Sequence, residues 1–251
     1  MPDASARLTR RRRAAAEIAP RPEQHHRGLD RGTARAAVFG VSDGLVSNVS
    51  LILGVAGADP GPGFVRLAGL AGLIAGAVSM AAGEYVSMKA QTELYEHELT
   101  LERRELARNP HVETVELTQI YQSRGIEPDQ ARLLAQQIMA DPELALQTHA
   151  REELGIDPER LGSPIAAAVA SFLAFAVGAL VPLVPWFFGS GNAAVDASIV
   201  LGLLASAVVG VLLARFTGRS PLFSAGRQML IATFAAGVTF FVGYAVGVGV
   251  T

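Results

Sequence analysis

The chain has 251 residues, of which 50% are hydrophobic and 18% are charged, and its mean hydropathy is +0.33. This balance excludes an ordinary soluble domain and predicts a membrane protein. Because the chain has no cysteine, disulfides, thiol catalysis and zinc–thiolate sites are excluded, and any metal must be held by oxygen, imidazole or thioether groups. The net charge of -2 hides two opposed regions: nine of the 21 basic residues lie within residues 1–35, and 15 of the 23 acidic residues lie within residues 93–159.

Residues 1–34 are predicted to form a basic, mobile arm. They combine the arginine cluster at 10–13 with Pro20 and Pro22, and they lack the apolar centre of a signal peptide. The arginines could attract anionic lipid head groups. Alternatively, they serve only as the cytosolic charge that orients the chain, and this interpretation needs no further assumption.

A first membrane span is predicted over about residues 35–57. This run is long enough to cross the roughly 30 Å hydrocarbon core of a bilayer, and Asp43 lies well inside it. Ser47 and Ser50 follow at helical spacing, so the span carries a polar stripe. A carboxylate at this depth costs several kcal/mol unless it is paired, protonated or bound to metal, and we therefore interpret Asp43 as functional.

The second predicted span begins near Phe64. Three glycines spaced seven residues apart predict a smooth face for close helix packing. They are Gly69, Gly76 and Gly83. We expect the opposite face to carry Met80, Glu84 and Met88, which are spaced four residues apart. Methionines alone are usually core residues, but a glutamate between them inside the membrane predicts a ligand face for a metal ion.

A long continuous helix is predicted from Phe64 to Arg108, because no proline, and no glycine after Gly83, interrupts this stretch. Its length is ~65 Å, about twice the thickness of the membrane core, so its second half must stand in water. Three prolines then open short predicted helices. They are Pro110, Pro128 and Pro142. Residues 91–160 are therefore expected to form a helical subdomain between the second and third spans.

The acidic residues of this subdomain form pairs on separate helices. The pairs are Glu102 with Glu105, Glu113 with Glu116, and Glu152 with Glu153. Helical bundles build carboxylate cages for divalent ions from such pairs, and His149 could add an imidazole. Spacing alone supports equally well a solvated acidic surface with ion pairs to arginines. The arginines would be Arg103, Arg104, Arg108 and Arg151. The link to a span with its own carboxylate and methionines favours the cage.

Three further spans are predicted over about residues 164–188, 193–214 and 226–250, the first of them interrupted by Pro182 and Pro185. None contains an interior charge, so the ion path is expected to lie in the first two spans. The loop between the third and fourth spans has no basic residue, whereas the segment between the fourth and fifth has three arginines. By the positive-inside rule, the N-terminus and the acidic subdomain are cytosolic.

Two segments closely resemble the signature segments of the vacuolar iron transporter family. They are FGVSDGLVSNVSLILGVAGA at 39–58 and AGAVSMAAGEYVSMKAQTELYEHEL at 75–99. Residues 36–251 resemble the family's architecture, which has five spans and a cytosolic metal-binding bundle between the second and third. Both segments are long and unusual, so the resemblance is specific.

The resemblance also implies which residues bind the ion. The transmembrane pathway would be formed by Asp43, Met80, Glu84 and Met88. The cytosolic site would be formed by Glu102, Glu105, Glu113, Glu116 and Glu153. Members of the family are dimers that exchange Fe²⁺, and in some cases Mn²⁺, for protons. This chain has His149 and Ala150 around positions where some relatives have methionines.

The sequence therefore predicts an all-α membrane protein with five transmembrane helices and a cytosolic helical bundle inserted between helices 2 and 3. The expected divisions are the arm at 1–34, helices 1 and 2 at 35–90, the metal-binding subdomain at 91–160, and helices 3 to 5 at 161–251. The expected function is transport of Fe²⁺ out of the cytosol in exchange for protons, with Mn²⁺, Co²⁺ and Zn²⁺ as further candidate ions. The alternative is a membrane-anchored metal buffer or sensor that transports nothing.

No enzymatic activity is expected, because the chain has no HExxH or GxSxG motif and no histidine inside a span. We expect no resident cofactor and no nucleic-acid partner. The expected partners are divalent metal ions, protons, membrane lipids and a second copy of the chain. One lysine against 20 arginines suggests a GC-rich bacterial coding sequence, and hence the bacterial inner membrane, with a vacuolar membrane as the alternative.

Overall fold

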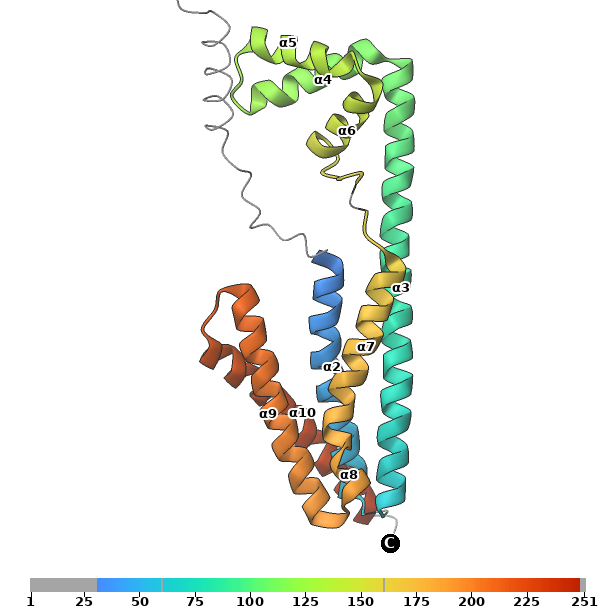
Figure 1. Cartoon of the computed structure of the whole chain (residues 1–251), viewed down its shortest axis with the longest axis vertical. Coiled ribbons are helices and arrows are strands. Elements are labelled where there is room, and N and C mark those ends of the chain that lie inside the picture. The colour runs from blue at the N-terminus through green and yellow to red at the C-terminus, as the bar shows by residue number, and fades with distance from the viewer. Residues whose placement is uncertain (1–30, 60, 160, 249–251) are drawn as a thin grey trace, which may run out of the picture. The chain divides into compact units, whose positions relative to one another are not determined.

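The computed structural model describes residues 31–59, 61–159 and 161–248, so the predicted arm lies outside the described residues except at its end. The described chain is all-α, and five of its helices are long and apolar enough to cross a membrane (Figure 1). These are α2 (Arg31–Gly57), α3 (Pro62–Arg108), α7 (Pro164–Leu183), α9 (Gly191–Thr217) and α10 (Pro221–Val248). The prediction of an all-α membrane protein with five spanning helices is confirmed.

Proline opens most of the helices, because its missing N–H costs nothing in the first turn and its ring fixes φ near the helical value. The helices that begin with proline are α3, α4, α5, α6, α7, α8 and α10. The side chains of Glu127, Asp141 and Ser163 accept hydrogen bonds from backbone N–H groups at three of these starts. The third span is interrupted where predicted, since α7 ends at Leu183 and α8 (Pro185–Phe188) follows. α2 begins at Arg31, and its apolar segment long enough to cross a membrane, Ala36–Gly57, agrees with the predicted span at 35–57.

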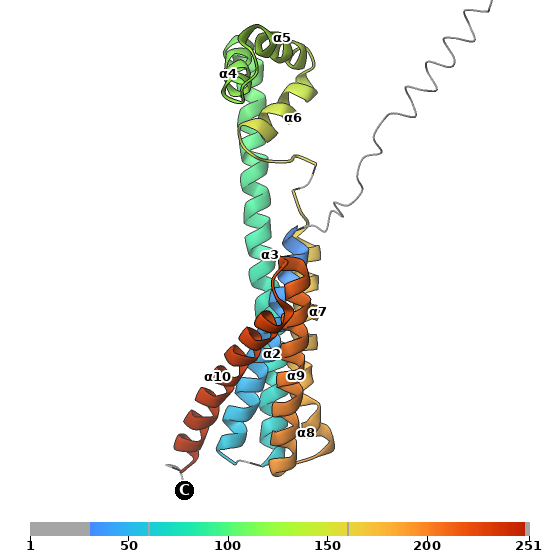
Figure 2. The same cartoon turned by 90° about the vertical axis from the view of Figure 1, so that its left-hand side faces the viewer.

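The long helix α3 is continuous over 47 residues. Its length is therefore about 70 Å, whereas about 30 Å suffices to cross the hydrocarbon core. Because the apolar half comes first and most of the charged residues lie between Lys89 and Arg108, the carboxyl-terminal half extends beyond the membrane-spanning part. Figures 1 and 2 show α3 running alongside α7 and continuing to the three short helices.

Three short helices follow α3 in the chain: α4 (Pro110–Ser123), α5 (Pro128–Met139) and α6 (Pro142–Glu152). Leu117 and Tyr121 of α4 pack against Ala131 and Ala135 of α5 in a small apolar core. α6 packs against both α3 and α5. The carboxyl-terminal part of α3 is thus held in one bundle with the short helices.

Small residues bring α2 close to its neighbours. A Cβ atom added at Gly44 of α2 or at Gly178 of α7 would collide with the backbone of the other helix. Gly54 of α2 and Gly243 of α10 make a similar backbone contact. Glycine permits such close approach between membrane helices. α2 is therefore packed against α7 on one side and α10 on another.

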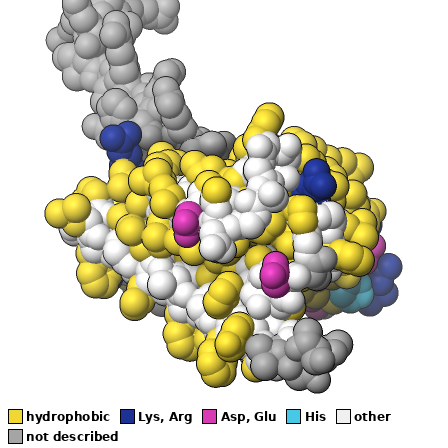
Figure 3. Space-filling view, turned by 90° about the horizontal axis from the view of Figure 1, so that it is seen from below, with side chains coloured by type: hydrophobic (Ala, Val, Ile, Leu, Met, Phe, Trp, Pro, Cys, Tyr) yellow, Lys and Arg dark blue, Asp and Glu magenta, His cyan; other side chains and the backbone are white. Residues whose placement is uncertain are grey.

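The outside of the spanning helices is apolar. Only 6% of the apolar window of α10 is buried within the chain. Seen from below, hydrophobic and uncharged side chains cover most of the described surface, and charged side chains are sparse (Figure 3). Such a surface needs lipid or another apolar partner, as expected for an integral membrane protein.

Candidate metal centre

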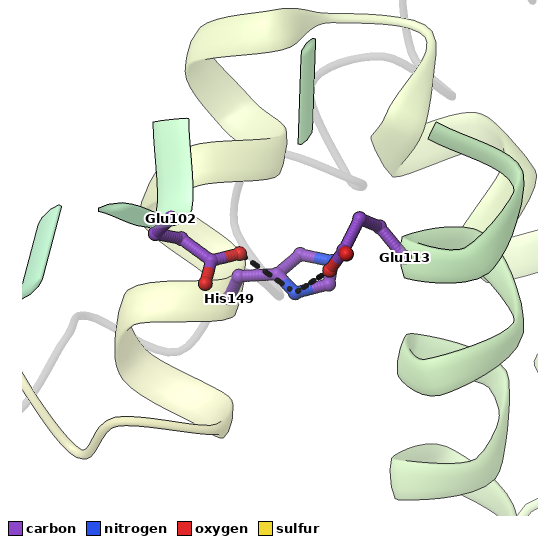
Figure 4. Close-up of side chains that lie close together, drawn as sticks. All are labelled: Glu102, Glu113 and His149. Carbon is purple, nitrogen blue, oxygen red and sulfur yellow. Dashed lines mark ion pairs between the residues drawn. The ribbon is translucent and has the colours of Figure 1, made fainter. Parts of the chain in front are cut away.

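Three helices place a histidine and two glutamates together in the bundle. Nδ1 of His149 on α6 lies 3.2 Å from Oε1 of Glu102 on α3 and 3.8 Å from Oε2 of Glu113 on α4. Figure 4 shows the imidazole between the two carboxylates. All three side chains are buried, and His149 is fully so, with 0% exposure. Glu153 adds a third carboxylate, with Oε2 at 3.4 Å from the same nitrogen.

The chain folds in a way that directs these groups to one point. The break at Asn109 turns the chain back after α3, so that Glu113 lies in the first turn of α4. His149 lies in the last turn of α6. A negative group at a helix N-terminus and a positive one at a C-terminus both interact favourably with the helix dipole.

The cluster has more hydrogen-bond acceptors than hydrogens that could be donated to them. A neutral imidazole nitrogen carries at most one hydrogen, yet Nδ1 of His149 faces three carboxylates. Burial and, to a smaller extent, the nearby charges of Glu153 and Glu113 together raise the pKa of Glu102 to about 7. Burial also raises the pKa of Glu113, against the opposing effect of His149. Bare carboxylates are therefore costly here, and a bound cation or a proton stabilises them.

The distances fit a metal ion. Metal bonds of about 2.0–2.2 Å to nitrogen and oxygen separate neighbouring ligand atoms by roughly 3.0–3.5 Å. The distances from Nδ1 to the carboxylates of Glu102 and Glu153 lie in this range, and that to Glu113 is slightly longer. Glu102, Glu113 and His149 each offer a ligand atom within 4.8 Å of the others. Carboxylate and imidazole together suit a borderline divalent ion such as iron, manganese or zinc.

The other two predicted glutamates lie beside this cluster. Glu105 is exposed and Glu116 is half-buried. Their charges raise the pKa values of Glu102 and Glu113, so both lie close enough to act on the cluster electrically. The side chain of Glu153 is 32% exposed. The acidic group therefore extends from a buried centre toward solvent.

The sequence also allowed an acidic surface with ion pairs to arginines, but the carboxylates around His149 are not paired in this way. Arg151 pairs with Asp157 and Glu159, and Arg124 pairs with Glu152. Within the described part of the chain, no arginine pairs with Glu102, Glu113 or Glu153. Glu152, predicted as a partner of Glu153, instead forms the ion pair with Arg124 between α6 and the end of α4.

A second group lies among the spanning helices. Asp43 of α2 and Met80 of α3 line the same cavity of about 310 Å³, which is also bordered by Phe175 of α7. Gly72 and Gly76 line it too, so the prediction that Met80 faces away from the glycines is wrong: residues four apart on a helix share a face.

The structure separates the remaining predicted pathway residues from this cavity. Glu84 is half-buried one turn further along α3 and does not line it. Met88 is buried against Gly162, where a Cβ would lie 2.6 Å from Cε of Met88. Of the four predicted residues, the structure therefore brings Asp43 and Met80 together.

Sequence reasoning overlooked Asn48, which also lines the cavity. It is 2% exposed, although it is a polar residue in a spanning helix. The available signal was its place beside the polar stripe of Asp43 and Ser47, since an amide inside a span needs a partner as a carboxylate does.

Across the described residues, the all-α fold with five apolar spanning helices and a buried carboxylate–imidazole cluster defines a membrane protein with a candidate metal centre. The profile of the VIT family matches residues 34–244. The chain is 32% identical to vacuolar iron transporter 1 of Tulipa gesneriana over 89% of this chain and 90% of the relative. It is 38% identical to the vacuolar iron transporter of Acanthamoeba castellanii over 85% of this chain and 78% of the relative. This chain belongs to the VIT family.

Proposed function

We propose that this protein is a membrane transporter that moves Fe²⁺ out of the cytosol in exchange for protons. One observation carries the proposal: the continuous helix α3 connects a buried carboxylate–imidazole cluster to a cavity among the spanning helices that contains Asp43 and Met80. The names of the relatives support iron as the transported ion.

In this proposal the helical bundle lies in the cytosol and captures the ion. Glu102, Glu113 and His149 bind it in the buried centre, and Glu153 lies at the more exposed side. Glu105 and Glu116 attract cations to the cluster and could bind further ions. The domain divisions proposed from the sequence follow, with residues 91–160 as the capturing subdomain.

The intramembrane part of the path is built around Asp43 and Met80. Glu84 lies one turn from Met80 toward the bundle and receives the ion between the two sites. Met88 is proposed as the next residue along the helix, although its burial against Gly162 favours a packing role. The thioether of Met80 disfavours Mg²⁺ and Ca²⁺, which prefer oxygen ligands, and leaves Fe²⁺, Mn²⁺, Co²⁺ and Zn²⁺ as candidates.

Competition between protons and metal at carboxylates gives the coupling. A carboxylate whose pKa is raised to about 7, as for Glu102, is largely protonated at mildly acidic pH and must lose its proton to bind a metal ion. An acid inside the membrane likewise needs a proton or another cation. Metal moving one way and protons moving the other is the outcome we propose.

The remaining parts of the proposal concern assembly and location. The apolar, little-buried α10 leaves a surface for lipid and for a second copy of the chain, and we propose a homodimer. The names of the relatives favour a vacuolar membrane, whereas the arginine-rich composition favours a bacterial inner membrane. In either membrane, we propose that the bundle and the N-terminus lie in the cytosol.

Flux measurements in proteoliposomes test the function. Wild-type protein should move Fe²⁺ and change the internal pH, and Asp43→Ala should abolish both while leaving metal binding by the bundle intact. Equal flux in wild type and Asp43→Ala would contradict transport through the cavity. Metal binding without flux in the wild type would support the alternative, a membrane-anchored buffer or sensor. The metal-binding cluster of the bundle would be sufficient for that function.

A further inference from the structure

The cavity beside Asp43 contains a polar group with no assigned role. Asn48 is 2% exposed on α2 and lines the same cavity as Asp43 and Met80. Its Nδ2 donates a hydrogen bond of 2.6 Å to the backbone oxygen of Ala179 on α7. Its Oδ1 is buried and has no hydrogen-bond partner among the described residues.

The hydrogen bond to α7 determines which way the amide points. A backbone oxygen can only accept, so the nitrogen of Asn48 must face Ala179 and the oxygen must face away from α7. That oxygen lies against α3, where a Cβ atom at Gly72 would be 3.0 Å from it. Gly72 itself lines the cavity. The oxygen is thus held at the cavity wall next to a residue without a side chain.

An unpaired amide oxygen inside a membrane protein is costly. The other polar groups nearby do not relieve it: the hydroxyl of Ser47 donates to the backbone oxygen of Asp43 at 2.5 Å. Amide oxygens are ligands for divalent cations. A cation in the cavity would therefore find a carboxylate, a thioether and an amide oxygen on two neighbouring helices.

We propose that Oδ1 of Asn48 is a ligand of the transported divalent ion, together with Asp43 and Met80. The inference rests on the proposed transport function and adds a third ligand to its intramembrane site. Because this ligand is neutral, it completes the coordination of the ion without adding a negative charge, which favours release of the ion. The hydrogen bond to Ala179 fixes the ligand before the ion arrives.

Two variants test the role of the oxygen. Asn48→Leu keeps the approximate volume and removes the oxygen. Gly72→Ala keeps the oxygen and places a methyl group 3.0 Å from it, while Cδ2 of Leu51, the end of a flexible side chain that this methyl group would otherwise meet, must move aside. Both should raise the apparent KM for Fe²⁺ in proteoliposomes by about tenfold. The matched control is Ser50→Ala, another buried polar residue of α2, with 7% exposure and an unpartnered hydroxyl among the described residues, which does not line the cavity.

A binding measurement separates this inference from the transport proposal. In a Glu102→Ala/Glu113→Ala background, Co²⁺ should still raise the unfolding temperature of the full chain in detergent. Adding Asn48→Leu should reduce this rise, whereas adding Ser50→Ala should not.

The flux and binding results together separate the two proposals. Suppose that wild type transports Fe²⁺, that Asp43→Ala does not, and that Asn48→Leu has a wild-type KM and a wild-type Co²⁺ response. The transport proposal then stands and the role of Asn48 is overturned. If wild type carries no flux, the effect of Co²⁺ on the unfolding temperature decides the role of Asn48. A Co²⁺-induced rise that Asn48→Leu reduces supports Asn48 as a ligand. No rise, or a rise that Asn48→Leu leaves unchanged, overturns that role.

Discussion

His149 is surrounded by more carboxylate oxygens than its hydrogen can satisfy. Nδ1 lies 3.2 to 3.8 Å from oxygens of Glu102, Glu113 and Glu153. Nε2 is buried and has no hydrogen-bond partner among the described residues. A hydrogen on Nε2 would leave the lone pair of Nδ1 directed at the carboxylates, as metal binding requires. Without metal, the same geometry concentrates negative charge in a buried place.

This charge should make the metal-free protein less stable at higher pH. Since the pKa of Glu102 is raised from 4.5 to about 7, folding favours its protonated form. The contribution of Glu102 to stability is therefore fully present below pH 4.5 and is lost as the pH rises through about 7. We expect the unfolding temperature of the full chain in detergent and chelator to fall between pH 5 and pH 8.

Glu102→Gln provides the comparison, because it keeps the shape of the side chain and removes its titration. The difference in unfolding temperature between this variant and wild type should grow in favour of the variant from pH 5 to pH 8. A difference that stays constant across this range, or that grows in favour of wild type, would contradict a raised pKa at Glu102.

Periodicity along α3 explains what could be predicted of the helices and what could not. The absence of proline predicted one continuous helix, and prolines at 110, 128 and 142 predicted the short ones. Four-residue spacing placed Met80, Glu84 and Met88 near one face, but it does not show what each residue meets along the axis. Met88 lies about 12 Å beyond Met80 along α3, and there it meets Gly162 instead of the cavity. The contact of Met88 with Gly162 depends on the fold of the loop at 161–162, which the helical periodicity does not predict.

The contact between α2 and α7 is equally a property of the assembled helices. The sequence shows glycines in both, but only the structure shows which of them touch. A methyl group at Gly178 would collide with the backbone of Val41. Gly178→Ala should therefore lower stability by about 1–3 kcal/mol through overpacking, although alanine is the better helix former.

Gly226→Ala is the matched control on α10, since a Cβ there meets nothing within 4 Å. It should leave the unfolding temperature in detergent unchanged or raise it slightly. Equal effects of the two substitutions would show that the close approach of α2 and α7 does not limit stability.

At the scale of the molecule, α3 joins two groups of ligands that are far apart. The rise of an α-helix puts Met80 and Glu102 about 33 Å from each other along its axis. The sequence predicted the candidates for both groups because acids in a span and paired acids on helices are each unusual. It could not show that the bundle buries Glu102, Glu113 and His149 together, because their meeting depends on how α4 and α6 pack against α3.

This separation predicts different transport defects at the two ends. Glu102→Ala/His149→Ala removes ligands that collect the ion but none that line the intramembrane cavity. It should raise the Fe²⁺ concentration for half-maximal flux by about tenfold and leave the flux at saturating Fe²⁺ close to that of wild type. Asp43→Ala should lose flux at every concentration. The control is Glu143→Gln, an exposed acid on the same helix as His149, which should match wild type. An unchanged half-maximal concentration in the double variant would remove the bundle from the transport path, because an ion that reaches the cavity equally well without the cluster does not pass through it.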